Sequence, residues 1–229
     1  VPVRKGPGLA LGLIPFIKKF TYIRIAMKNI EVEVRGLLTK NKYNDLIKKF
    51  DQDGKFIREK DRVLLCYHDP KHKEIENKSI DIRLRATNGM PEIITKLGKW
   101  GGAENRKELS VMINQGDFDK MVQIFGFVGL TEGYICIRKG KIYDYMNIEF
   151  SLVEVPGHSY YFEAEKMVSH ESDFGKIHQE IEKVCSSLGL KIFTDQEFYD
   201  YIKKLDNESN KVFSFEDYKE GYFQKTFNI

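Results

Sequence analysis

The chain has 229 residues, of which 41% are hydrophobic and 31% charged, and its 37 basic side chains nearly balance its 34 acidic ones. This length and composition suit one domain with a single substantial core. The even charge balance argues against a basic groove for nucleic acid, so we expect no nucleic-acid partner.

The first 28 residues differ in charge from the rest of the chain. They contain no acid, and their basic residues are Arg4, Lys5, Lys18, Lys19, Arg24 and Lys28. The apolar run at 9–17 falls far short of the roughly 20 residues that cross a bilayer, so we expect no membrane partner. A basic, acid-free segment suits organelle targeting, and an upstream extension or an added sequence, with Met27 as the natural start, explains it equally well. We therefore place residues 1–28 outside the fold.

The cysteines indicate neither a disulfide framework nor a zinc site. Cys66, Cys136 and Cys185 are odd in number, lie far apart and show no CxxC spacing. We expect reduced thiols and a cytoplasmic location, unless the leader directs the protein to an organelle.

Charged and apolar residues alternate strictly in the first strand, which puts Glu31, Glu33 and Arg35 on one face and apolar side chains on the other. A half-buried strand usually turns such charges to water. Here the same alternation returns in residues 80–86 and 162–166. A sheet that repeats charges on one face can enclose them by closing into a barrel.

The remaining elements follow in chain order. Strands are expected at 29–35, 56–67, 79–86, 91–97, 106–114, 133–139, 142–155 and 158–168. Helices are expected at 37–50 and 117–127 and through the last sixty residues. There, apolar residues from Phe174 to Leu188 recur at helical spacing, and Thr194 with Glu197 forms a capping box for another helix. The dipeptide Asn88-Gly89 predicts a tight hairpin, since both residues accept positive φ.

The charged faces together hold similar numbers of acids and bases. The acids are Glu31, Glu33, Glu108, Glu149, Glu163 and Glu165, and the bases are Arg35, Arg83, Arg85, Lys96, Arg106 and Arg138. Burying so many charges is costly unless water, a metal and a polyanion complete the pairing. Glutamates of the first and last strands meet if the barrel closes, and hard cations such as Mg²⁺ or Mn²⁺ prefer such oxygen ligands. The forked donors of arginine match phosphate oxygens.

At this point the sequence resembles a known family. Glu31-Val32-Glu33-Val34-Arg35 is similar to the ExExK signature of the CYTH domain, the triphosphate tunnel metalloenzyme superfamily, which includes thiamine triphosphatases, class IV adenylyl cyclases and inorganic triphosphatases. Similar steps follow in order: the Arg-x-Arg strand at 82–85, a lysine strand at 95–99, Arg-x-Glu at 106–108, basic residues at Arg138 and Lys141, and the closing Glu-x-Glu at 162–165.

The chain departs from the family pattern at two positions. Arg35 stands where lysine is usual. On the seventh strand, where the family generally has an aspartate, this chain offers Val153 or Ser151, with Glu149 and Glu154 nearby.

The resemblance implies an α+β fold, an eight-stranded antiparallel closed barrel with helices packed outside, over residues 29–206, followed by a helical tail at 207–229. It implies hydrolysis of a small triphosphate (inorganic triphosphate, thiamine triphosphate or a nucleoside triphosphate) with Mg²⁺ or Mn²⁺ as cofactor. The implied catalytic residues are Glu31, Glu33, Lys96, Glu163 and Glu165. The implied phosphate-binding residues are Arg35, Arg83, Arg85, Lys96, Arg106, Arg138 and Lys141. The implied metal ligands are Glu31, Glu33, Glu163 and Glu165, with Glu108 and Glu149 as further candidates.

Two other functions fit the same fold. One is a class IV adenylyl cyclase, in which the ribose hydroxyl of ATP replaces water as the nucleophile. The other is a polyphosphate-binding module without turnover, which the missing aspartate favours. A barrel for apolar ligands does not fit, because its interior would carry apolar residues. The sequence is compatible with a monomer or a homodimer.

Overall fold

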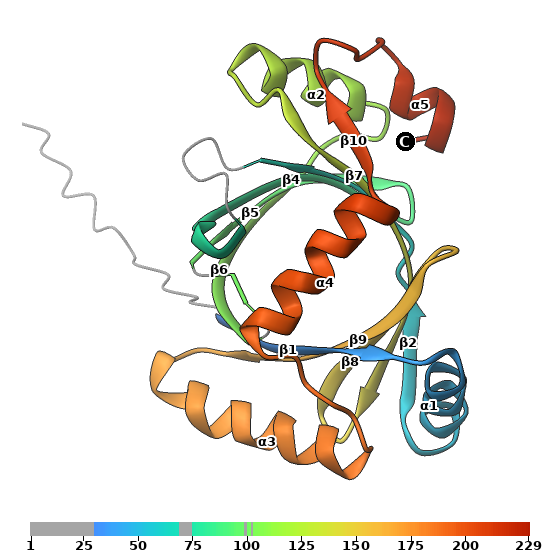
Figure 1. Cartoon of the computed structure of the whole chain (residues 1–229), viewed down its shortest axis with the longest axis vertical. Helices are drawn as coiled ribbons and strands as arrows, with labels where there is room; N and C mark the ends of the chain where they lie inside the picture. The colour runs from blue at the N-terminus through green and yellow to red at the C-terminus, as the bar shows by residue number, and fades with distance from the viewer. Residues whose placement is uncertain (1–29, 69–74, 99, 102) are drawn as a thin grey trace, which may run out of the picture.

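The computed structural model of the chain describes residues 30–68, 75–98, 100–101 and 103–229 (Figure 1). The basic leader at 1–28 lies outside these residues, as does Lys99 of the expected lysine strand and turn. None of the described helices is long and apolar enough to cross a membrane.

Within the described residues, eight strands close into an antiparallel barrel, which confirms the expected α+β architecture (Figure 1). They are β1 (Ile30–Leu38), β3 (Arg62–Tyr67), β4 (Ile80–Thr87), β5 (Met90–Leu97), β6 (Ala103–Met112), β7 (Glu132–Tyr145), β8 (Ile148–Val155) and β9 (Ser159–Val168). Their order around the ring is β7-β3-β4-β5-β6-β1-β9-β8, and β8 pairs with β7 to close it. The first and last predicted strands are therefore neighbours, with Glu33 opposite Glu165.

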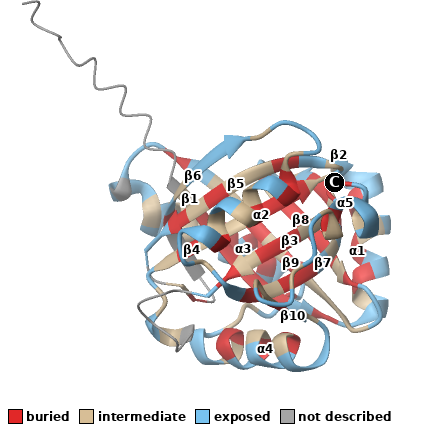
Figure 2. Cartoon of the chain, turned by 90° about the horizontal axis from the view of Figure 1, so that it is seen from above, coloured by how far each residue is buried: buried red, intermediate tan, exposed pale blue. Residues whose placement is uncertain are grey.

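Helices cover two sides of the barrel, and each packs against the apolar outer face of strands (Figure 1). On one side lie α1 (Lys40–Asp53) and α3 (Phe174–Ser187), whose Phe50 and Ile181 pack in one core with Val34 and Phe162. On another side, α2 (Phe118–Phe127) and α5 (Tyr222–Phe227) form a second core with β3 and β4. Figure 2 shows buried residues along the strands beneath these helices. Because apolar residues face out, the alternating charges face in.

The hairpin between β4 and β5 confirms its sequence signal, since Asn88 and Gly89 both have positive φ, of 50° and 81°. The strand expected at 56–67 is instead interrupted at Lys60 and Asp61, which separate β2 (Lys55–Glu59) from β3. The Asn88 side chain bridges the interruption: its Oδ1 accepts from the Asp61 amide at 2.9 Å and its Nδ2 donates to the Glu59 carbonyl at 2.9 Å.

The turn between the sixth and seventh predicted strands was placed wrongly. Gly140 lies inside β7, and the chain reverses at Met146 and Asn147, whose φ angles are 56° and 59°. The Asn147 amide donates to Asp144 Oδ1 at 3.2 Å, which stabilises this turn. Gly140 resembles a turn residue in the sequence, but in the strand it accepts the close approach of Lys60, whose carbonyl would lie 3.1 Å from an added Cβ.

The tail expected to be helical begins with a strand, β10 (Lys211–Ser214), which pairs with β7. The short helix α5 follows and is held by Asp119 of α2. One Asp119 oxygen accepts from the Phe223 amide at 3.1 Å and the other from the Gln224 amide at 2.9 Å. A carboxylate at a helix N-terminus satisfies amides that have no partner within the helix.

Helix α4 (Asp195–Glu208) lies across the ring of strands in Figure 1. Its capping box of Thr194 and Glu197 is confirmed. The segment before it is held against β1, because the Phe193 amide donates to the Arg35 carbonyl at 2.8 Å. Gly36 permits this approach, since a Cβ there would overlap the Lys191 carbonyl and the Phe162 ring.

We expect Gly36→Ala to lower the free energy of unfolding by about 1–3 kcal/mol, because the added methyl overpacks β1 against residues 191–193. The matched control is Gly175→Ala on α3, where an added Cβ meets nothing within 4 Å. Alanine favours helix, so this control should be neutral or stabilising by up to about 1 kcal/mol. Urea denaturation of both variants measures the difference, and equal stability would contradict the close packing at Gly36.

Candidate metal and phosphate site

Carboxylates of β1 and β9 meet inside the barrel. Glu31, Glu33 and Glu165 each place a carboxylate oxygen within 4.8 Å of the others. The register of the two strands brings this about, because Glu33 lies directly opposite Glu165 and Glu31 is two residues before it. We call these residues the carboxylate cluster.

Glu163 was expected to join the cluster but is engaged by Arg35 instead. The Arg35 Nε donates to Glu163 Oε1 at 3.3 Å, and its Nη2 donates to Glu33 Oε2 at 2.5 Å. Burial alone would raise the pKa of Glu163, but Arg35 and Lys60 outweigh it and lower this pKa to about 2. Glu163 is therefore the ionised partner of a buried arginine beside the cluster.

The cluster itself is short of positive charge. Burial and the neighbouring Glu31 raise the pKa of Glu165 to about 8, and burial raises that of Glu33 well above its usual value. Burial acts on Glu31 too, but Lys96, whose Nζ lies 2.7 Å from Glu31 Oε2, brings its pKa down to about 2. A divalent cation would displace the proton that Glu165 holds at neutral pH.

The donor set fits a hard divalent cation. It offers only carboxylate oxygens, which Mg²⁺ and Mn²⁺ prefer over the nitrogen and sulfur donors that zinc and copper favour. Glu33 is only 2% exposed, so its charge is not compensated by bulk water. Of the expected metal ligands, Glu31, Glu33 and Glu165 come together. Glu149 lies opposite Glu165 on β8, and Glu108 is joined to Glu31 through Lys96, but neither belongs to this group of three.

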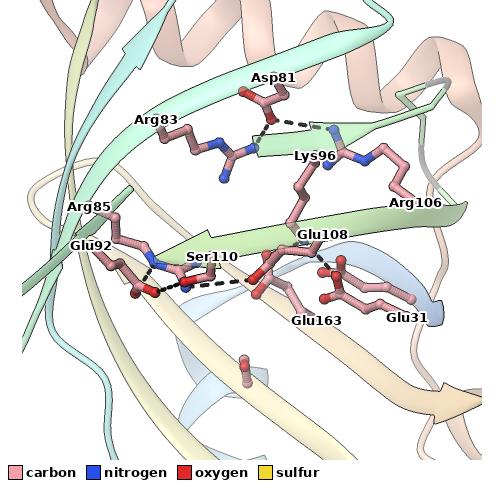
Figure 3. A network of polar contacts seen from close by, with 12 residues as sticks. Glu31, Asp81, Arg83, Arg85, Glu92, Lys96, Arg106, Glu108, Ser110 and Glu163 are labelled. Carbon is pink, nitrogen blue, oxygen red and sulfur yellow. Dashed lines mark hydrogen bonds and ion pairs between the residues drawn. The ribbon is translucent and has the colours of Figure 1, made fainter. Parts of the chain in front are cut away.

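Facing the cluster is a set of basic residues held in place by acids (Figure 3). Asp81 of β4 accepts from Arg83 and lies 3.4 Å from Arg106 Nη1 and 3.2 Å from Lys78 Nζ. Burial would raise the pKa of Asp81, but these cations hold it well below its usual range. Two guanidinium groups are thus fixed on one carboxylate, with their orientation set before any ligand binds.

A second group of contacts lies further along the tunnel interior (Figure 3). Lys96 Nζ lies 2.7 Å from Glu31 and 3.1 Å from Glu108, so it joins the carboxylate cluster to β6. Arg85 Nε donates to Glu92 Oε1 at 2.8 Å, and Ser110 donates to the other Glu92 oxygen at 2.7 Å. These residues confirm that β1, β4, β5 and β6 present their charges to one another.

The structure separates the two expected basic residues of β7. Arg138 lines the cavity and its Nη2 donates to Asn210 Oδ1 at 3.0 Å. Lys141 does not face inward: it lies opposite Leu152 on the outer face, 3.6 Å from Glu59. Its assignment to phosphate is therefore corrected, because β7 continues through Gly140 and alternation turns Lys141 outward.

Two basic residues inside the barrel were not predicted from the sequence. Lys60 and Arg62 line the cavity, and Lys60 is 8% exposed. Burial, with the neighbouring Arg62 charge, lowers the pKa of Lys60. Its Nζ lies 3.4 Å from Ser151 Oγ, so the residue that stands near the expected aspartate contacts a lysine. Lys60, Arg62 and Leu64 lie two residues apart, which would have placed them on one face of a strand, but the apolar run that follows Arg62 obscured this pattern.

A cavity of about 690 Å³ lies between the strands and α4. Its barrel wall is basic and its α4 wall is largely aromatic and aliphatic. The basic residues are Arg35, Lys60, Arg62, Arg83 and Arg138, and the residues from α4 include Phe198, Tyr201, Ile202 and Leu205. Arg35 and Glu163 line the cavity and connect it to the carboxylate cluster.

Comparison with solved structures identifies the fold. The PH1819 protein of Pyrococcus horikoshii superposes with a TM-score of 0.63 at 22% identity, covering 76% of this chain and 98% of that one. The PH1012 protein of the same organism gives 0.56 at 20%, with 71% and 94% covered. A candidate adenylate cyclase from Vibrio parahaemolyticus gives 0.55 at 14%, with 71% and 90% covered. The chain shares the fold of these proteins, a closed eight-stranded antiparallel barrel with helices outside.

The sequence comparisons add no closer assignment to this tunnel. No family model matches the chain, and no curated protein matches it. The fold is therefore identified from the structure, and the chemistry of the barrel interior is inferred from its side chains.

We expect Mn²⁺ to stabilise the protein by about 2.7 kcal/mol when its concentration is a hundred times the dissociation constant. Glu33→Gln should lose most of this stabilisation, because it removes a buried ligand of the carboxylate cluster. The control is Glu180→Gln on α3, whose carboxylate is exposed and pairs with Lys166 at 2.8 Å. Thermal unfolding with and without Mn²⁺ measures the shift, and a full shift in Glu33→Gln would exclude a metal at the cluster.

Proposed function

We propose that the tunnel hydrolyses a small triphosphate in a reaction that depends on a divalent cation. The observation that carries this proposal is the carboxylate cluster facing fixed guanidinium groups inside one barrel. Phosphoryl transfer needs mainly positioning and neutralisation of charge, and these groups supply both. A metal site alone would not need the guanidinium groups, and a basic groove alone would not need the carboxylate cluster.

Glu31, Glu33 and Glu165 would hold the cation, which when bound supplies Lewis-acid polarisation of a phosphoryl oxygen and an activated water. Lys96 stands between this cluster and β6, where its ammonium neutralises charge next to the reacting phosphoryl group. Arg83 and Arg106 would bind the remaining phosphates through their forked guanidinium groups. Asp81 positions these arginines.

Arg35 has a distinct part because it touches both halves of the site. It pairs with Glu33 and Glu163, and its guanidinium carbon lies 5.3 Å from the centre of the Phe198 ring of α4. A phosphate bound at Arg35 would therefore affect both the carboxylate cluster and the contact of Arg35 with α4.

Adenylyl cyclisation is the second candidate. The Vibrio neighbour supports it, and so does a cavity with an aromatic wall that is large enough for more than three phosphates. We rank it below hydrolysis, because cyclisation also needs the ribose hydroxyl to be held in line with the α-phosphate. A polyphosphate-binding module without turnover is the third candidate, supported by Val153 and Ser151 at the two positions where an aspartate was expected.

The first test of the proposal is turnover. We expect phosphate release from tripolyphosphate, thiamine triphosphate or ATP with Mg²⁺ or Mn²⁺, and none with EDTA. Glu33→Gln should reduce the rate at least about 100-fold, since several kcal/mol depend on the cation. Cyclic AMP from ATP would support the second candidate. Binding of tripolyphosphate by calorimetry without any product would support the third.

The second test separates inward from outward basic residues. Arg83→Ala should raise KM about tenfold or more, because a charge-assisted contact to phosphate contributes roughly 1.5–3 kcal/mol. Lys141→Ala is the matched control: it removes the same charge from the outer face of the barrel and should leave kcat and KM unchanged. Steady-state kinetics on both variants give the comparison, and equal losses would mean that net charge, not the tunnel wall, decides binding.

A further inference from the structure

Two thiols face each other in the wall of the cavity, away from the carboxylate cluster. Cys66 on β3 and Cys136 on β7 both line the cavity. The strands are adjacent and antiparallel, with Cys66 opposite Tyr134 and Leu64 opposite Cys136. The two cysteines are therefore diagonal neighbours on the inner face of the barrel.

The surroundings of this pair favour a reactive thiolate. Arg83 lies directly opposite Cys66 on β4, and Arg138 follows two residues after Cys136. The neighbouring Cys136 thiol, helped by Arg83, lowers the pKa of Cys66 to about 7 in spite of burial. Cys66 and burial raise the pKa of Cys136, whose Sγ donates to the Tyr134 carbonyl at 3.8 Å. Low-pKa thiols beside a second thiol are the arrangement that redox-responsive proteins use.

We propose that Cys66 and Cys136 form a modification site in the cavity wall, where a peroxide converts the thiol pair into a reversible disulfide that weakens phosphate binding. The Cys66 thiolate attacks one peroxide oxygen, an S–O bond forms, the O–O bond breaks, and the leaving oxygen takes a proton to become water. The Cys136 sulfur then attacks the sulfenic sulfur, an S–S bond forms, and a second water leaves. Two thiols and one hydrogen peroxide give one disulfide and two waters.

The geometry needs only a small adjustment of the strands. Diagonal neighbours in antiparallel strands have Cα atoms about 7–8 Å apart, with shorter Cβ separations. Disulfides need Cα separations of about 4.4–6.8 Å, so β3 must shift slightly along β7 to bring the two residues nearer. Arg83 pairs with Cys66 across β3 and β4, so this movement shifts a guanidinium that the proposed function assigns to phosphate. The effect on binding rests on that proposed function, whereas formation of the disulfide does not.

The third cysteine provides an internal control. Cys185 of α3 is fully buried in the hydrophobic core, and burial raises its pKa to about 12. It should remain a thiol under peroxide treatment that oxidises the cavity pair.

The test treats the full chain with hydrogen peroxide and maps its cysteines by mass spectrometry. We expect loss of two hydrogen atoms in a crosslink between the peptides that carry Cys66 and Cys136, with Cys185 free. Cys66→Ser and Cys136→Ser should each abolish the crosslink, and dithiothreitol should reverse it. Oxygen adducts in place of the crosslink, or crosslinks only between molecules, would overturn the proposal.

Calorimetry with tripolyphosphate then measures the consequence. Oxidation should weaken binding about tenfold or more in the wild type, since displacements of around 1 Å in a positioned site are that costly. The affinity of the serine variants should not change with peroxide. If the disulfide forms and the affinity for tripolyphosphate does not change, the proposed effect of oxidation on phosphate binding is wrong. If the reduced protein binds no tripolyphosphate, the proposed function fails, while the mapped crosslink still decides whether the modification site exists.

Discussion

Charge compensation inside a closed barrel is the constraint on which the rest of this structure depends. Removing an ion from water costs several kcal/mol, so each interior charge needs a partner of opposite sign. Lys96 lies between Glu31 and Glu108, Arg35 between Glu33 and Glu163, and Asp81 among three cations. At Glu33 and Glu165 of the carboxylate cluster, burial outweighs the neighbouring cations and raises the pKa. A divalent cation bound there would supply the remaining compensation.

The same alternation that encloses the charges also builds the exterior. Val32 and Val34 are fully buried on the outer face of the strand that carries Glu31 and Glu33 inside. Their contacts with α1 and α3 fix β1 against β9, and this register holds the carboxylates together. The hydrophobic cores thus contribute to the site indirectly, because they determine which residues face one another across the strands.

Local periodicity explains which parts of the site could be predicted. Glu31, Glu33, Glu163 and Glu165 were found because each strand alternates without interruption and the first and last strands meet on closure. Lys60 was missed because the interruption before β3 depends on the distant Asn88, and Lys141 was placed inward because Gly140 resembles a turn residue while the chain reverses at Met146 and Asn147. The strand β10 was missed for a related reason, since it exists through pairing with β7. Alternation within a strand can be read from the sequence, whereas the ends of the strands depend on contacts made in the folded chain.

Lys60 changes what the missing aspartate means. Had an acid stood in place of Ser151, it would lie near a lysine and would add little to a cation at the cluster. With Ser151, the Lys60 amine has a hydroxyl at 3.4 Å and the carboxylates of Glu163 and Glu165 nearby. A cation at the cluster would take protein ligands from β1 and β9, with Glu149 of β8 opposite Glu165, and would keep its other positions for water and phosphate oxygens, as Mg²⁺ commonly does. If the barrel binds a triphosphate as proposed, the wall at Lys60 and Ser151 would contact phosphate and not the metal, while the carboxylate cluster stays intact.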